Sequence, residues 1–231
     1  EMKELHSWHL DPKQAIAVQN ELRKHLVLAW DGREVSTVGG ADVSVKEGLA
    51  RAAIVVLRFP ELTPVAAATA EMPVPFPYIP GLLTFREGPV VLAAWECLSV
   101  KPDLMLYDGQ GIAHPRGIGL AAHMGLWLEC PSIGVAKTWL YGEYNEPGRL
   151  KGEAAELLAP REARKVLGAV VRTRTNVKPI YVSPGHLIDV SHAIEYTLGC
   201  CTRYRLPETT RGAHLLSAQA HRVARGDLLP G

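Results

Sequence analysis

The order of apolar and polar positions divides the chain into a strand-rich first part and a later part in which helices and strands alternate. Residues 12–29 follow an Asp-Pro pair typical of a helix start and repeat apolar side chains at helical spacing, which predicts an amphipathic helix. Three strand-like runs follow, separated only by short polar or proline-containing breaks, which predicts an antiparallel meander. These runs cover residues 35–45, 49–60 and 64–74.

Beyond the meander, prolines and helical periods mark the remaining elements. Four prolines exclude regular structure over residues 73–81, so we expect a stiff loop there. Helical spacing resumes at Arg86 and places Pro89 in the first turn of that helix, where a missing N–H is harmless. The pattern then predicts helices over 116–129, 189–201 and 208–224, and strands over 103–108, 132–138, 166–173 and 179–183.

This succession predicts one α/β domain, residues 1–231, built on a mixed sheet. Residues 143–165 match none of these patterns, and we expect a mobile insert over the functional site.

Composition narrows the class of protein only slightly. Hydrophobic residues make up 47% of the 231 residues, which is ample for a core. No apolar run reaches the roughly 18 residues of a membrane span, and the N-terminal residues lack the features of a signal peptide. The four cysteines show no metal-type spacing. We therefore expect a cytoplasmic protein with reduced cysteines and no membrane partner.

The net charge of +1 conceals an asymmetry along the chain. Residues 1–148 carry a net charge of −5, whereas residues 149–225 carry +7. A basic second half is able to hold phosphates while an acidic first half holds a metal ion. Ordinary variation of surface charge explains the asymmetry equally well, and on charge alone it is the better explanation.

Three acidic residues lie at ends or breaks of predicted apolar elements. Asp42 lies within the first strand, Glu87 opens the helix after the meander, and Asp108 ends the next strand. Buried carboxylates that converge repel one another, and a divalent cation removes that cost. Oxygen ligands without a matching His/Cys set favour Mg²⁺ or Mn²⁺ over zinc. If the first and fourth strands are neighbours, Asp42 and Asp108 share one ion, as metal-assisted phosphodiester hydrolysis requires. Taken singly, each acid is explained as well by an ion pair, a helix dipole or a turn.

The segment from Gly109 to His114 imitates a dinucleotide-binding motif but lacks its third glycine. His114 occupies that position, and Asp108 immediately before the segment carries the wrong charge for a pyrophosphate. We therefore reject a dinucleotide site. His114 in a glycine loop and Lys137 at the end of an apolar strand are better candidates for chemistry, whereas His214 is also consistent with a simple helix face.

Six segments, in this order, resemble the endonuclease V family from about residue 12 to residue 220. They read "GGADVSV", "PYIPGLLTFRE", "PDLMLYDGQGIAHPRGIGLAAH", "PSIGVAKTWLYG", "SPGH" and "YRLPETTRGAH". The resemblance implies a ribonuclease H-like fold, with a five-stranded mixed core sheet flanked by helices. It also implies an Mg²⁺-dependent endonuclease, with Mn²⁺ as a substitute, that repairs deaminated adenine. Such enzymes nick the second phosphodiester 3′ to inosine and leave 3′-hydroxyl and 5′-phosphate ends.

The same resemblance assigns roles to individual residues. Asp42 and Asp108 would hold the metal, with Glu87 as the third acid, and His214 would contact the metal or orient water. Lys137 would contact the scissile phosphate or position water. Inosine-containing DNA is the expected partner, RNA stays open as a second one, and we expect a monomer. The substrate-binding residues implied are Tyr78, Pro80, Gly81, Leu83, Gly109 and His114.

Physical chemistry makes these roles reasonable. A tyrosine held between prolines loses little entropy when it enters a strand as a wedge, and inosine pairs weakly enough to be extracted cheaply. Main-chain groups at Gly81 and Gly109 would then read the hypoxanthine edge. Two alternatives stay open: another ribonuclease H-like nuclease, such as a resolvase, or a non-catalytic binder of modified nucleic acid.

Overall fold

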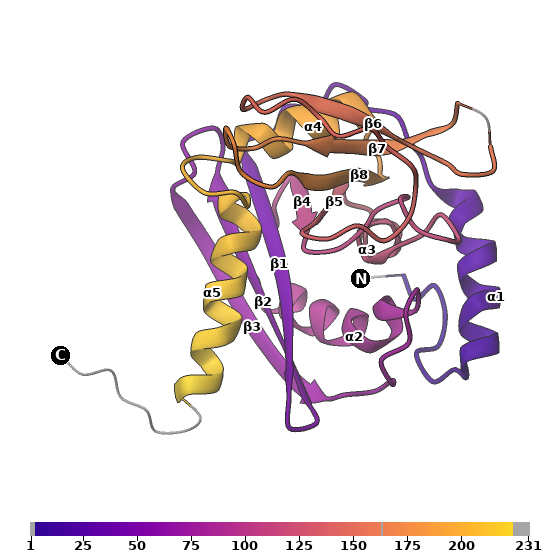
Figure 1. Ribbon diagram of the computed structural model, residues 1–231. Coiled ribbons are helices and arrows are strands. Elements are labelled where there is room, and N and C mark those ends of the chain that lie inside the picture. Colours follow the sequence, from indigo (N-terminus) through magenta and orange to yellow (C-terminus); the bar gives the residue numbers. More distant parts are fainter. Residues whose placement is uncertain (1–2, 163, 224–231) are drawn as a thin grey trace.

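A single eight-stranded mixed sheet runs through the computed structural model, which describes residues 3–162 and 164–223 (Figure 1). Its strand order is β3-β2-β1-β4-β5-β8-β7-β6. The predicted antiparallel meander is confirmed as β1 (Thr37–Lys46), β2 (Leu49–Arg58) and β3 (Pro64–Pro73). The next two strands, β4 (Leu104–Tyr107) and β5 (Ser132–Ala136), continue parallel to β1.

Three antiparallel strands extend this sheet beyond the five strands that the resemblance implied. They are β8 (Ile180–His186), β7 (Val166–Val171) and β6 (Ala154–Leu158). Strand β6 lies inside the segment that we expected to be a mobile insert, and this expectation was wrong. A run of five residues is too short to show a reliable period, and only its pairing with β7, from Ala154 opposite Val171 to Leu158 opposite Val166, reveals the strand.

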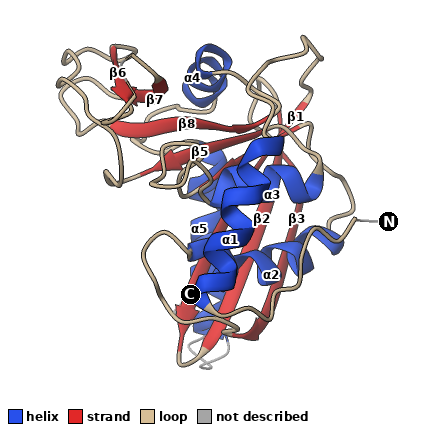
Figure 2. Ribbon diagram, turned by 90° about the vertical axis from the view of Figure 1, so that its right-hand side faces the viewer, coloured by secondary structure: helices blue, strands red, loops and turns tan. Residues whose placement is uncertain are grey.

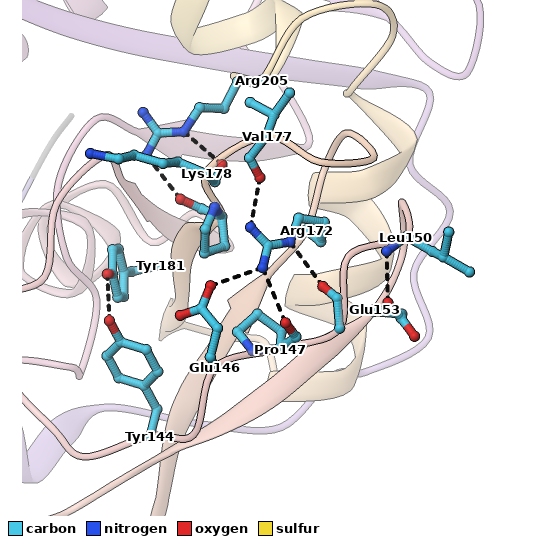
Figure 3. Close-up of polar contacts among 12 residues, drawn as sticks. Tyr144, Glu146, Pro147, Leu150, Glu153, Arg172, Val177, Lys178, Tyr181 and Arg205 are labelled. Atoms are coloured by element: carbon cyan, nitrogen blue, oxygen red, sulfur yellow. Dashed lines mark hydrogen bonds and ion pairs between the residues drawn. The ribbon is translucent and has the colours of Figure 1, made fainter.

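A buried arginine anchors the same segment. The Arg172 guanidinium donates to the carbonyls of Pro147 and Gly148, to that of Val177 and to the carboxylate of Glu146 (Figure 3). Four acceptors around one buried cation join the turn before β6 to the loop before β8, because a buried guanidinium left unpaired is costly.

Helices cover both faces of the sheet, as the mixed α/β pattern predicts (Figure 2). On one face, α2 (Leu83–Glu96) packs on the meander and α3 (Leu120–Leu128) packs on β4, β5 and β8. The two helices share one core, which includes Ile54, Val91 and Met124. On the other face lie α4 (Val190–Gly199) and α5 (Glu208–Val223). No helix among the described residues is long and apolar enough to cross a membrane. The four cysteines form no disulfide.

The first helix is shorter than its apolar period predicted. Helix α1 (Pro12–Leu22) begins at a capping box between Asp11 and Gln14, and one 3₁₀ turn, Arg23–His25, ends it. Leu26 is extended, and residues 26–29 form no helix. The apolar face of α1 packs against the proline-rich loop, and its Ala15 shares a small core with Phe76.

Helix α2 begins at Leu83, three residues before the predicted start. Pro89 is therefore an interior residue of the helix, whereas we had expected it in the first turn. Its missing N–H leaves the carbonyl of Phe85 without the usual i+4 donor. The earlier start has a functional consequence, because Leu83 and Glu87 now lie one turn apart on the same face of the helix.

Candidate active site

Two adjacent parallel strands bring the first and last of the three acids together. Strands β1 and β4 pair only from Val38 to Ala41, and the N–H of Asp108 donates to the carbonyl of Ala41 over 3.3 Å. Asp42 is thus the first residue of β1 beyond the paired stretch, and Asp108 directly follows β4. The adjacency on which the sequence prediction depended is confirmed.

Helix α2 adds Glu87 to these two residues. All three line a small cavity of about 160 Å³, which we call the acid cavity, together with Leu83, Val91, Tyr107 and Leu120. Burial, and then the charges of Asp42 and Asp108, raise the pKa of Glu87 to about 8. Burial and the charge of Asp108 raise the pKa of Asp42 as well, against the hydrogen bonds that it accepts. The three carboxylates therefore repel one another inside one cavity.

Helix α5 supplies the polar partners of Asp42. The hydroxyl of Ser217 donates to Oδ2 of Asp42 over 2.9 Å, and Nδ1 of His214 lies 3.1 Å from the same oxygen. The approach of α5 depends on Gly40, since a Cβ there would overlap the main chain of Thr209. Sequence reasoning missed Ser217. Its position three residues after His214, on the same helix face, was the available signal.

Lys137 directly follows β5 and contacts one of the three acids. Its Nζ lies 2.5 Å from Oδ2 of Asp108, so the predicted phosphate-contacting lysine and metal-binding aspartate form an ion pair. Arg205, which sequence reasoning did not single out, ties the main chain at Lys137 to the loop that precedes β8, and Figure 3 shows its contact with Lys178. Its guanidinium donates to the carbonyls of Lys137, Lys178 and Pro179 over 2.7, 2.9 and 2.8 Å.

A second cavity, of about 330 Å³, adjoins the first. Its walls include all six predicted substrate-binding residues, together with Lys137 and the segment Thr138–Leu140. We call it the glycine cavity, because Gly81, Gly109 and Gly119 contribute to its walls. Asp108, Leu83 and Leu120 line both cavities, so a ligand in one lies beside the acids of the other. The predicted residues are Tyr78, Pro80, Gly81, Leu83, Gly109 and His114.

Three side chains from distant segments converge on the carbonyl of Gly81. Gln19 and Arg116 each donate to it over 2.8 Å, and Nε2 of His114 lies 2.9 Å away. Nδ1 of His114 accepts from the N–H of Arg116, which leaves the ring proton on Nε2. Burial lowers the pKa of His114 to about 4, so the ring is neutral at pH 7.

These three contacts, which we call the clamp, leave the proline-rich loop with fewer main-chain groups that can bind a ligand. We had expected both main-chain groups of Gly81 to read a base, but the carbonyl is already engaged by the clamp and only the N–H stays available. His114 therefore acts here by holding the proline-rich loop. Gln19 was missed by sequence reasoning, because nothing local relates a residue of α1 to a loop 62 residues away.

The carboxylate oxygens of the acid cavity are ligands of the kind that Mg²⁺ prefers. Among the residues that the structure describes, no three His, Cys, Asp or Glu side chains form a ready-made metal cluster. Mg²⁺ keeps several of its waters and commonly binds through one or two carboxylates, so Asp42 and Asp108 would be enough to hold it. The raised pKa values of Asp42 and Glu87 reflect a repulsion that a cation would remove.

A meander followed by parallel strands, helices on both faces, one acid on the first strand and one directly after the fourth define a ribonuclease H-like nuclease. Comparison with known proteins agrees with this class. The family model of endonuclease V matches residues 20–215, and the chain belongs to the endonuclease V family. Membership in this family of enzymes decides against the resolvase and the non-catalytic binder that the sequence left open.

Relatives and solved structures match over nearly the whole chain. The endonuclease V of Methanothrix thermoacetophila is 48% identical, over 96% of this chain and 97% of the relative. The crystal structure of endonuclease V from Streptomyces avermitilis has a TM-score of 0.88 at 43% identity, over 95% of this chain and 96% of that one. Endonuclease V of Ciona intestinalis, in complex with a 24mer DNA containing an inosine followed by a ribo-adenosine, has a TM-score of 0.82 at 30% identity, over 92% and 98% of the two chains.

Proposed function

We propose that the chain is an Mg²⁺-dependent endonuclease that nicks DNA at the second phosphodiester 3′ to inosine, in repair of deaminated adenine. It would leave 3′-hydroxyl and 5′-phosphate ends. The observation that carries the proposal is the shared wall of the two cavities, since Asp108 lines both the acid cavity and the glycine cavity. A nucleobase bound in one places its own strand at the acids of the other. The inosine-containing DNA bound by the Ciona relative supports the substrate class.

The glycine cavity suits a single extracted base. Its volume of about 330 Å³ is near the lower end for ligand pockets, which suits one nucleobase better than a base pair. Gly109 supports this assignment, because a Cβ there would meet nothing closer than Leu120 at 3.6 Å. The protein therefore does not need glycine at this position for its own packing. The absence of a side chain there is explained by a ligand that must approach the main chain closely.

Tyr78 has the properties of a wedge. It is 68% exposed, it lines the glycine cavity, and it lies between Pro77 and Pro80. When a base leaves the duplex, a ring at the mouth of the cavity can stack on the neighbours that remain.

The acids and their partners divide the chemical step among them. Mg²⁺ held by Asp42 and Asp108 would polarise the scissile phosphate and acidify the attacking water. Lys137, beside Asp108, offsets charge that grows on the phosphate. His214 shares a hydrogen bond with Asp42 through Nδ1, and the tautomer that carries its proton on Nδ1 leaves Nε2 as an acceptor for a proton from water. Glu87 is the second candidate to orient the water.

A nicking assay tests the proposal directly. Duplexes with inosine, with uracil and with adenine at one position are incubated with Mg²⁺ or with a chelator, and the products are sized and end-labelled. We expect a nick only in the inosine strand, only with Mg²⁺, one nucleotide beyond the lesion on its 3′ side. Release of a free base, or equal cleavage of all duplexes, would contradict the proposal. Inosine-containing single-stranded RNA, assayed in parallel, decides between DNA and RNA as the preferred substrate.

A further inference from the structure

Two aromatic side chains differ from all the others in the described part of the chain. Tyr78 and Trp139 are the only Trp, Tyr or Phe residues there that are exposed, at 68% and 55%, and both line the glycine cavity. Exposed large apolar groups at the mouth of one cavity indicate a binding surface, because burying them elsewhere would stabilise the fold. Tyr78 has a role in the proposed function, whereas Trp139 has none so far.

The indole of Trp139 is held in place before any ligand binds. Its Nε1–H donates to the carbonyl of Gly142 over 2.8 Å, which closes the short loop that follows β5. Gly142 has φ +105°, a conformation that residues with a side chain rarely adopt, so glycine at this position suits the turn that brings its carbonyl to the indole. A ring that is already fixed loses little rotamer freedom on binding, and indole offers the largest π surface for stacking on a base.

The place of Trp139 in the chain identifies which base it meets. It lies two residues after Lys137, whose ammonium group contacts Asp108 at the acid cavity, and it also lines the glycine cavity. In the proposed function, on which this inference rests, inosine occupies the glycine cavity and the second phosphodiester lies at the acids. A single nucleotide, the 3′ neighbour of inosine, lies between those two positions.

We propose that Trp139 is a stacking site for the nucleobase immediately 3′ to the lesion. Stacking accepts every base because each has a π face, so the site strengthens binding and orients the nucleotide that carries the scissile bond without hydrogen bonds to the base edge. Purines, which have the larger face, bind more tightly at this position than pyrimidines.

A double-mutant cycle across the protein–DNA contact tests the proposal. Trp139→Ala is combined with strands in which the 3′ neighbour of inosine is either a normal nucleotide or an abasic one, and binding is followed by fluorescence anisotropy with Ca²⁺ in place of Mg²⁺. We expect Trp139→Ala to weaken binding about 10-fold on the normal strand and less than about 2-fold on the 3′-abasic strand. A strand that is abasic at the 5′ neighbour of inosine is the control. On that strand Trp139→Ala should again weaken binding about 10-fold.

Two further variants separate stacking from folding. Trp139→Phe keeps an aromatic ring and restores most of the affinity, whereas Trp139→Leu keeps apolar volume and does not. Thermal unfolding of each variant is measured alongside. Equal losses on all three strands, or equal rescue by Phe and Leu, would overturn the stacking site. Such a result leaves the proposed function intact, because that function fails only if the wild-type protein shows no inosine-dependent nicking.

Discussion

The two cavities of this protein adjoin each other but are built in opposite ways. The acid cavity takes its functional side chains from regular elements: Asp42 from β1, Glu87 from α2, and Asp108 from the end of β4. The glycine cavity is lined mainly by loops, whose shape depends on prolines, glycines and the clamp on the carbonyl of Gly81. Repelling charges need rigid supports that keep them together, whereas recognition of a flat base needs main chain that a ligand can approach closely. Each cavity should therefore fail in its own way.

The largest expected effect is on the acid cavity. Asp42→Ala or Asp108→Ala should reduce the single-turnover nicking rate by at least on the order of 10³-fold, because each change removes a charge that the chemical step requires. Binding of inosine-containing DNA should survive within a few-fold, since Asp42 lies outside the glycine cavity and Asp108 is only one of the many residues that line it. Asp31→Ala, which changes an exposed aspartate paired with Arg33, is the control and should leave both quantities unchanged. Near-normal Mg²⁺-dependent nicking by either cavity variant would exclude the metal assignment.

The next largest effect should fall on recognition alone. Gly109→Ala is expected to fold normally, because its Cβ would meet only Leu120, yet to weaken inosine binding by on the order of 10²-fold by filling the cavity. The matched change, Gly111→Ala, places a Cβ against the carbonyl of Pro184 and should destabilise the fold by at least about 1–3 kcal/mol. Binding isotherms and thermal unfolding of both variants separate the two outcomes. If Gly109→Ala binds inosine normally, the base does not approach that main chain.

Removal of the Tyr78 side chain should have a smaller effect on nicking, and one that depends on whether the substrate is a duplex. Tyr78→Ala is expected to reduce nicking of duplex substrate about 10-fold more than nicking of the same sequence as a single strand, because only the duplex has a gap to fill. Tyr78→Phe keeps the ring and serves as the control. Equal losses on the two substrates would argue against a wedge.

A separate effect, on the free energy of unfolding and not on nicking or binding, depends on pH. Because burial holds the pKa of His114 near 4 while an unfolded histidine titrates near 6.5, the unfolded state binds a proton first on acidification. The neutral His114 ring therefore contributes fully to the free energy of unfolding above pH 6.5, and this contribution is lost as the pH falls toward 4. At pH 5 the loss amounts to about 2 kcal/mol. Denaturant unfolding of the wild-type protein and of His114→Asn at pH 7 and pH 5 measures it. The variant should be less stable at pH 7 but lose less on acidification.

Local patterns in the sequence were enough for much of this protein. The alternation of apolar residues predicted the meander and the mixed sheet, because a strand or helix repeats its buried face at short intervals. Each of the three acids interrupts such a pattern, which marked them as candidates. The resemblance to a family then assigned all three to one metal centre. The prolines of residues 73–81 and the glycines of residues 109–114 likewise act on their own backbone, so these loops could be anticipated. The helix predicted over 116–129 begins only at Leu120, so the last residues of the glycine loop were assigned wrongly.

Other features were decided only by the tertiary structure. The pairing of β6, the clamp from Gln19 to Gly81 and the hold of Arg205 on the Lys137 segment join residues far apart in the chain. The same is true of Ser217, which donates to Asp42 across 175 residues. The pinned, exposed ring of Trp139 also became visible only once the cavity beside it was defined. A hydrogen bond between distant segments has no period and no composition of its own, so its partners can be recognised only when the folded chain brings them together.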